Sequence, residues 1–350
     1  MDVIKGIAII CVVIGHSHNG ALLLNRFVFS FDIPIFFIIS GFLFAENNSV
    51  KLSAGNIAYR NFRRLLLPYI ATALIVFFIV MTFVVISLNK NNSAFYDYIS
   101  SLKYAVKYLL LTYGYASGVK VTQLSLEIKP AGITWFLPSL FCADLIFYYF
   151  LRLSKNRSVI FQSIVVILLT GAGYLAGKYI FLPWSLDISL VSQVFLFSGY
   201  LMQRYKVFEN KTSVWLIIAI AGIWVLDIFM GAIDLNTRRY NHLAVSLGGA
   251  IGASYLLMKL SHYLSGSASM YLRPVSYIGR RSLFILCFQL FDKINYFTML
   301  EHFSAYLYNN NHWVLLTGLR LCISLCMAEI MKFIPPLKFI YWPKISRMNN

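Results

Sequence analysis

Charged side chains are scarce in this sequence. Only 12% of the 350 residues are Asp, Glu, Lys or Arg, whereas soluble domains contain about 25%. Hydrophobic residues make up 59% of the chain, and the mean hydropathy is +0.71. A soluble protein of this composition would expose large apolar patches and aggregate. The composition therefore excludes a soluble globular domain and predicts an integral membrane protein.

Acidic residues are the rarest of the charged ones. Asp and Glu number 13 against 30 Lys and Arg, which gives a net charge of +17. In a soluble protein this excess would suggest nucleic-acid binding, but here the basic residues cluster in short segments between apolar stretches. That distribution is typical of loops held in the cytoplasm, so we expect no nucleic-acid partner.

The cysteines and the apolar pattern argue against a metal site, a membrane β-barrel and a cleaved signal peptide. The five cysteines lie inside apolar runs without the spacing of a metal site, so we expect small core residues and no metal. Alternation of apolar and polar residues with period two, the signature of a membrane β-barrel, is absent. The first apolar stretch lacks a small-residue cleavage site and is interpreted as a true span rather than a signal peptide.

Apolar runs of about 20 residues, enough to cross about 30 Å of hydrocarbon, recur along the chain. Each must be a helix, because a lone helix satisfies its own backbone. Ten runs qualify: 2–22, 27–45, 65–88, 132–151, 159–178, 186–203, 212–231, 241–259, 277–300 and 312–332. We expect an all-α, polytopic membrane protein with about ten transmembrane helices, forming one domain over 1–335 with a short cytoplasmic tail over 336–350.

The basic residues predict the orientation of these helices. With a cytoplasmic N-terminus, most Lys and Arg fall on the inner side, which is the usual bias. Both termini are then cytoplasmic. The outer segment 96–116, YDYISSLKYAVKYLLLTYGYA, carries apolar residues at helical spacing and is predicted to be an amphipathic helix on the membrane or over a cavity.

The opening stretch, DVIKGIAIICVVIGH, places three ionisable residues in an apolar run. Such groups cost at least about 2.5–3.5 kcal/mol each inside a span and often mark function. Lys5 and His16 are separated by about 16 Å of rise and nearly three turns, so they share a helical face. Asp2 can pair with Lys5 three residues later. Because histidine suits proton transfer near neutral pH, His16 is a candidate catalytic residue; the alternative is a structural hydrogen bond between helices.

The second stretch, FSFDIPIFFIISGFLF, has Asp32 and Pro34 early and Ser40-Gly41 late in a span. Pro34 frees a backbone carbonyl, and Asp32 needs a donor or a cation. A helix kink with Asp32 at the outer interface explains these residues equally well. Ser40-Gly41 is also typical of close helix packing.

The third stretch, YRNFRRLLLPY, is an arginine cluster just before a span. Arg60 and Arg63 are three residues apart and are expected on one helical face, with Arg64 beside them. Anchoring to the inner membrane surface explains the cluster. Phosphate capture explains it too, because the guanidinium fork matches phosphate oxygens.

In order and spacing, DVIKGIAIICVVIGH, FSFDIPIFFIISGFLF, RNFRRLLLPY, ITWFLPSLF and YIGRRSLFIL resemble the membrane-bound acyltransferase 3 family, and more narrowly its sugar and polysaccharide O-acetyltransferases. The resemblance runs from residue 1 to about 300. It implies transfer of an acetyl group from cytoplasmic acetyl-CoA to a hydroxyl of a cell-surface glycan or lipid-linked saccharide. It also implies a multi-pass protein of a bacterial inner membrane, with lipid around it.

The resemblance carries particular residues with it. The family's Arg, ten residues, then His falls on Lys5 and His16, and its Arg-x-x-Arg, thought to hold the CoA phosphates, falls on Arg60 and Arg63. The family's Trp falls on Trp135, which the resemblance makes a further candidate for binding the acetyl-CoA. Two positions depart from the pattern: Lys5 replaces the commoner Arg, and Gln289 stands where relatives often have His, so any acid–base role of that position is lost here.

These residues combine into a hypothesis about mechanism. CoA phosphates bind Arg60, Arg63 and Arg64, and Lys5, steadied by Asp2, sets the polarity near the thioester. His16 is either the general base for the acceptor hydroxyl or the first carrier of the acetyl group, and the sequence leaves both routes open.

The acceptor side is less clearly marked. Under the expected topology Asp32, Arg238, Arg239 and His242 lie at the outer mouth and are candidates for binding an acidic or pyrophosphate-bearing glycan. A solvated loop is an equally good explanation for the last three. A transporter or flippase for a lipid-linked sugar is the alternative function, although the paired broken helices of many transporters are missing. A structural or sensory membrane protein is the third.

Overall fold

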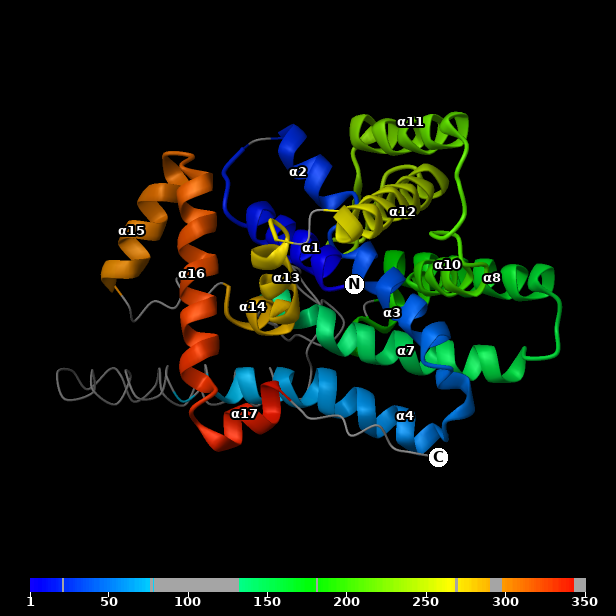
Figure 1. Ribbon diagram of the computed structural model, residues 1–350, viewed down its shortest axis with the longest axis horizontal. Helices are drawn as coiled ribbons and strands as arrows, with labels where there is room; N and C mark the ends of the chain where they lie inside the picture. The colour runs from blue at the N-terminus through cyan, green and yellow to red at the C-terminus, as the bar shows by residue number, and fades with distance from the viewer. Residues whose placement is uncertain are drawn as a thin grey trace.

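The computed structural model describes residues 1–20, 22–75, 78, 132–180, 182–267, 270–289 and 298–342. Helices dominate it (Figure 1). The segment expected to be amphipathic, 96–116, and part of the run expected at 65–88 lie outside the described residues. The helices longer than six residues include α1 (Asp2–Gly15), α2 (Leu22–Phe29), α3 (Pro34–Glu46), α4 (Ala54–Asn61), α7 (Phe136–Leu153), α8 (Val159–Tyr179), α10 (Gln193–Arg204), α11 (Val214–Met230), α12 (Leu243–Ser267), α13 (Arg273–Arg280), α14 (Ser282–Phe288), α15 (Thr298–Asn309), α16 (Trp313–Met331) and α17 (Pro335–Tyr341). The described residues 67–75 are helical as well.

Short elements connect these helices. The π-helix η2 (Phe62–Leu66) continues α4, and α9 (Leu186–Val191) precedes α10. The described residues also contain three 3₁₀ turns: η1 (Ser49–Lys51), η3 (Gly132–Trp135) and η4 (Pro183–Ser185). The strands β1 (Ile233–Asp234) and β2 (Arg239–Tyr240) form a small antiparallel hairpin between α11 and α12.

Five helices among the described residues are long and apolar enough to cross a membrane: Leu22–Glu46, Phe136–Leu153, Val159–Tyr179, Leu243–Leu264 and Trp313–Met331. A sixth span results if Pro183–Val191 and Gln193–Arg204, which meet at a bend of 51°, are taken together. Each of these overlaps an apolar run of the sequence. The prediction of a helical membrane protein is confirmed; the number of ten spans stays a prediction.

Two expected runs are interrupted in the structure. The first, 2–22, ends as a helix at Gly15, because Ser17, Asn19 and Gly20, which follow, are residues that favour turns. The ninth, 277–300, breaks between α13 and α14. At this break Arg280 forms an ion pair with Asp2 on α1, and the next residue, Arg281, forms one with Glu329 on α16.

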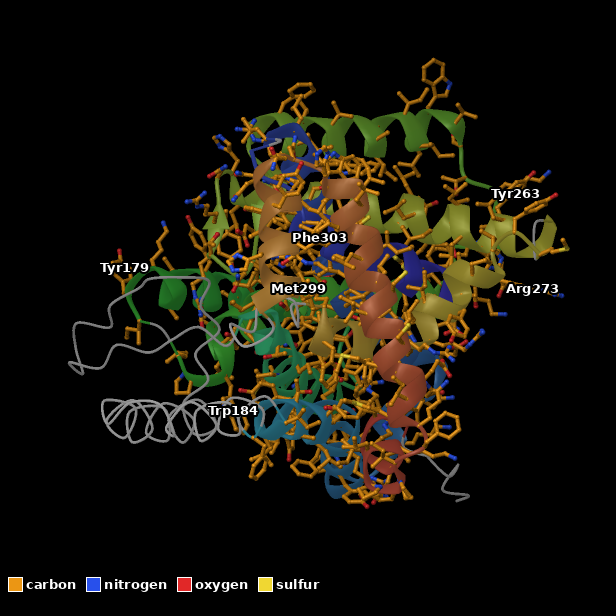
Figure 2. All side chains as sticks on the ribbon, turned by 90° about the vertical axis from the view of Figure 1, so that its left-hand side faces the viewer. Tyr179, Trp184, Tyr263, Arg273, Met299 and Phe303 are labelled. Carbon is orange, nitrogen blue, oxygen red and sulfur yellow. The ribbon has the colours of Figure 1, made fainter. Side chains whose placement is uncertain are left out.

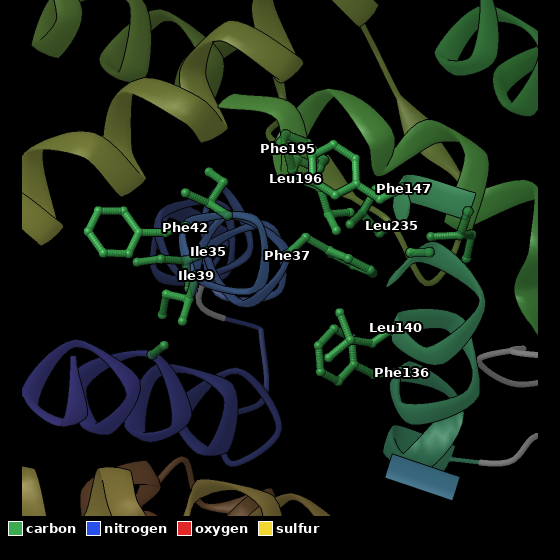
Figure 3. Close-up of a cluster of buried hydrophobic side chains, with 14 of the residues drawn as sticks. Ile35, Phe37, Ile39, Phe42, Phe136, Leu140, Phe147, Phe195, Leu196 and Leu235 are labelled. Atoms are coloured by element: carbon green, nitrogen blue, oxygen red, sulfur yellow. The ribbon is translucent and has the colours of Figure 1, made fainter. Parts of the chain in front are cut away.

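α3 lies at the centre of the core and packs closely against α10. A Cβ added to Gly41 would stand 1.9 Å from the Leu196 carbonyl oxygen, and one added to Gly199 would stand 1.9 Å from that of Ile38. Only glycine permits this approach, so close helix packing is one role of Gly41. Figure 3 shows α3 side chains meeting those of α7 and α10, with Phe37 edge-on to Phe136 at 5.2 Å between ring centroids.

α1 packs against α13 in the same way, beside α14 (Figure 1). A Cβ on Gly6 would lie 2.1 Å from the Val275 carbonyl oxygen, and one on Gly279 would lie 1.8 Å from that of Asp2. This contact brings Arg280, at the end of α13, to the first turn of α1.

The outside of the molecule carries many large apolar side chains. Tyr179, Tyr263 and Met299 are at least three-quarters exposed (Figure 2). α8 and α11 expose further aliphatic and aromatic residues along their length. Water is a poor solvent for such a surface, whereas lipid is a suitable one. Two cysteines expected in the core, Cys322 and Cys326, also lie on the exposed side of α16.

Candidate functional site

A cavity of about 310 Å³ opens beside the first two turns of α1. Its polar lining comes from α1, α3, η2 and the α13–α14 junction, and its apolar lining comes mainly from α3, α7 and α14. The lining residues are Asp2, Lys5, Ile9, Phe36, Ile39, Ser40, Leu43, Arg64, Leu65, Phe136, Leu137, Leu140, Gly279, Arg280, Ser282, Leu283 and Leu286. The cavity thus combines a cationic rim with apolar walls.

The rim contains more positive than negative groups. Among the described lining residues, Lys5, Arg64 and Arg280 are cationic and Asp2 supplies the one carboxylate. The expected pair of Asp2 with Lys5 is not what the structure has: Asp2 lies 3.9 Å from Arg280, which the close approach of α13 brings to it. The side chain of Lys5 makes no hydrogen bond or ion pair with the residues that the structure describes. Its ammonium is therefore available to an anionic ligand.

Arg64 is held in the rim by a buried carboxylate on α7. Asp144 is 1% exposed and accepts hydrogen bonds from Ser40 Oγ at 2.7 Å, Asn61 Nδ2 at 3.2 Å and Arg64 Nη2 at 3.4 Å. Sequence reasoning missed Asp144, although a carboxylate inside an apolar run was a signal for it. Ser40, whose role the sequence left open, fixes this carboxylate from α3.

The three arginines of the cluster have separate partners. Arg60 Nη2 donates to Ser49 Oγ at 3.0 Å, whereas the guanidinium of Arg63 lies over the ring of Phe339 on α17, 4.3 Å from its centroid. The π-helical turn that begins at residue 62 explains this divergence, because its wider turn changes the alignment of side chains three residues apart. The pKa of Arg60 is lowered, because its burial and the charge of Arg64 outweigh the opposing effect of Asp144.

His16 lies at the other end of α1, where it caps the helix. Its ring faces that of Phe29, with 6.4 Å between the two ring centroids. Its backbone carbonyl accepts a hydrogen bond from Arg320 Nη1 at 2.5 Å. Ile9 is the last residue of α1 that lines the cavity, so about 10 Å of helix separates the cavity from His16. Arg320 is a second residue that sequence reasoning left without a role.

Trp135 precedes a wall of the cavity but is not part of it. Its side chain is 2% exposed and lies in the core, with its ring 6.3 Å from that of Phe136. Phe136 and Leu137, the next residues, do line the cavity. In this structure Trp135 supports the wall from behind.

The residues expected at the acceptor side lie apart from the cavity. Asp32 is buried between α2 and α3, where one carboxylate oxygen accepts the Ile33 N–H at 2.7 Å. Arg238 is paired with Asp187 through two hydrogen bonds, from Nε at 2.7 Å and Nη2 at 3.2 Å. Arg239 and His242 are exposed on and just after β2.

Gln289, the second position at which the sequence was expected to depart from the family pattern, is 1% exposed. Neither atom of its amide has a hydrogen-bond partner among the described residues. Within the same part of the chain, no three His, Cys, Asp or Glu side chains come together as a metal site would require.

Comparison with known proteins identifies the family. The family model described as an acyltransferase domain matches residues 1–329. No curated protein and no solved structure matches the chain. The match covers almost the whole chain, including the cavity, the arginine cluster and His16, and the chain therefore belongs to the acyltransferase 3 family of membrane acyltransferases.

Proposed function

We propose that this protein transfers an acetyl group from cytoplasmic acetyl-CoA to a hydroxyl of a cell-surface sugar or polysaccharide. The observation that carries the proposal is the cavity in which Lys5, Arg64 and Arg280 face an apolar interior. A ligand with phosphates at one end and an uncharged acyl-bearing arm at the other matches both halves of this lining. Family membership supplies the class of reaction.

The cationic rim is the proposed binding site of the phosphates. Of the arginine cluster, Arg64 lines the cavity, whereas Arg60 and Arg63 do not. The side chain of Arg63 makes no hydrogen bond to any described residue, and that of Arg64 makes one at 3.4 Å, so both retain donors for phosphate oxygens. Arg60 lies close enough to Arg64 to add to the same field. Arg280, which the sequence did not single out, completes the set. The apolar walls then guide the acyl arm along α1 toward His16.

His16 is the proposed catalytic residue. As a general base it accepts the proton of the acceptor hydroxyl while the hydroxyl oxygen attacks the acetyl carbonyl, and the CoA thiolate leaves. In the second route the imidazole nitrogen attacks first, and the acceptor then takes the acetyl group from His16. Both routes require the acyl arm to extend beyond Ile9.

The proposed topology has ten spans, with both termini in the cytoplasm of a bacterial cell. Lys5, Arg64 and Arg280 belong to three segments that the charge pattern assigns to the inner side, and all three line one cavity. On the opposite side, Asp32, Arg239 and His242 remain the candidates for contact with the acceptor.

The decisive experiment measures acetyl transfer from radiolabelled acetyl-CoA to glycan in membranes. His16→Ala is compared with the native chain and with His302→Ala, which removes an exposed histidine of α15, at matched expression. We expect His16→Ala to lose about 10²–10⁴-fold of the rate and His302→Ala to keep it. Full transfer by His16→Ala would refute the site. Movement of a lipid-linked sugar by the native chain without consumption of acetyl-CoA would favour the flippase.

A further inference from the structure

Arg320 is the largest fully buried side chain in the described part of the molecule. It lies in the middle of α16, a candidate membrane span, and is only 2% exposed. Thr317 and Ser324 are buried on the same face of the helix. A charged group at such a position is costly and usually marks function. Neither the cavity nor the arginine cluster uses it.

Arg320 binds the end of α1 at two points. Its Nη1 donates to the His16 carbonyl oxygen at 2.5 Å and to Ser17 Oγ at 3.2 Å. Ser17 Oγ in turn donates to the Val13 carbonyl oxygen at 2.6 Å. One guanidinium therefore ties the last turn of α1 to a helix some 300 residues further along the chain.

The site of attachment has a physical meaning. The last carbonyls of a helix have no partner within it and carry the negative end of the helix dipole. A buried cation at this end compensates both. The planar guanidinium also fixes the direction of its donors, so the bond to the His16 carbonyl restricts rotation of the peptide that carries the imidazole. Phe29 limits the ring itself.

We propose that Arg320 is the positioning residue for His16. It acts through the peptide of His16 and through Ser17, and it holds the imidazole in the direction from which it reacts with the acyl donor. The inference rests on the proposed catalytic role of His16. Because the donor cavity lies at the opposite end of α1, loss of Arg320 should slow the chemical step and leave donor binding unchanged.

The test compares kcat and the KM for acetyl-CoA in Arg320→Gln, Arg320→Lys and Glu329→Gln, per amount of folded protein. Glu329, nine residues after Arg320 on α16, forms an ion pair with Arg281 Nη2 at 2.6 Å. It anchors the same helix away from His16 and therefore serves as the matched control. A misplacement of about 1 Å can cost about 100-fold in rate. We expect Arg320→Gln to lose about 100-fold in kcat, with the KM for acetyl-CoA within about twofold of the native value. Arg320→Lys keeps a donor and a charge, and its kcat should be at least about tenfold higher than that of Arg320→Gln. Glu329→Gln should lower thermal stability only.

Ser17→Ala provides a second variant that leaves the buried charge in place. It removes one of the two attachments and should lower kcat about three- to tenfold, with KM unchanged. An unchanged kcat in Arg320→Gln and Ser17→Ala would overturn the inference, as would an equal loss in Glu329→Gln. Failure of the proposed function is distinguishable, because His16→Ala would then retain transfer or the native chain would show none.

Discussion

Two arginine–aspartate pairs in this protein have the same chemistry and different surroundings. Both aspartates are 1% exposed and each pairs with an arginine far away in sequence. Arg238 gives two hydrogen bonds to Asp187, at 2.7 and 3.2 Å, and its side chain is 5% exposed. Arg64 gives Asp144 one contact at 3.4 Å, and its side chain is 35% exposed.

The difference separates a structural pair from one that can serve a ligand. Asp187 accepts hydrogen bonds from two nitrogens of the Arg238 guanidinium, and this pair attaches the β1–β2 hairpin to α9. Asp144 is also satisfied by Ser40 and Asn61, which leaves Arg64 with donors to spare at the cavity. Both arginines were expected to bind ligands. The geometry supports that role for Arg64, whereas Arg238 is engaged within the protein.

Arg238→Gln should have the largest effect on stability. Removing one partner of a buried ion pair typically costs about 3–5 kcal/mol, because the other charge stays buried and unpaired. We expect this loss in the free energy of unfolding, seen as a lower midpoint of thermal unfolding in detergent, with an unchanged KM for acetyl-CoA. Replacing both partners, Arg238→Met with Asp187→Leu, should recover most of it. If Arg238→Gln keeps full stability and raises the KM for the acceptor, Arg238 binds substrate as first expected.

Arg64→Gln should act on binding instead of stability. A hydrogen bond to a charged group contributes about 1.5–3 kcal/mol, which corresponds to an increase of about ten- to one-hundredfold in the KM for acetyl-CoA. Arg64→Lys should fall in between, because it keeps the charge and loses the fork. The thermal midpoint should hardly move. A KM equal to that of the native chain would show that the phosphates bind elsewhere.

Salt should distinguish the two pairs without any substitution. The Debye length falls from about 30 Å at 0.01 M to about 8 Å at 0.15 M, and buried pairs are screened much less than exposed charges. We expect the KM for acetyl-CoA to rise about five- to tenfold over this range. The contribution of the Asp187 pair, measured as the difference in midpoint between native chain and Arg238→Gln, should stay constant. Equal sensitivity of both quantities would contradict the comparison.

Local pattern was enough to predict some of this molecule. The apolar runs that became α7 and α8 were visible in the sequence, and so was the tight packing at Gly41. Arg64 was expected at the CoA phosphates and Lys5 near the thioester, and both residues line one cavity. These features depend on composition, on helical period or on a motif, all of which a single chain displays.

The contacts that join distant segments could not be read in the same way. Asp2 and Lys5 are neighbours on a helix, yet the glycine contact between α1 and α13 brings Arg280 to Asp2. Asp144 meets Arg64 across 80 positions, and Arg320 meets His16 across 304. Helical period says which face a residue occupies and never which helix will cover it. Charges inside apolar runs were the available signal for Asp144 and Arg320.

Arg63 extends the comparison to an arginine held by a ring instead of a carboxylate. Phe339 supports its guanidinium at 4.3 Å while occupying none of its hydrogen-bond donors. A cation–π contact of this kind is worth about 0.5–1 kcal/mol, so Phe339→Ala should raise the KM for acetyl-CoA only about two- to fivefold. Phe339→Tyr keeps the ring and should behave as the native chain. A larger loss in Phe339→Ala, with a lower thermal midpoint, would mean that α17 stabilises the fold beyond orienting Arg63. An aromatic support that positions a cation without neutralising it is what a phosphate site requires, and the locked Arg238 shows the opposite arrangement.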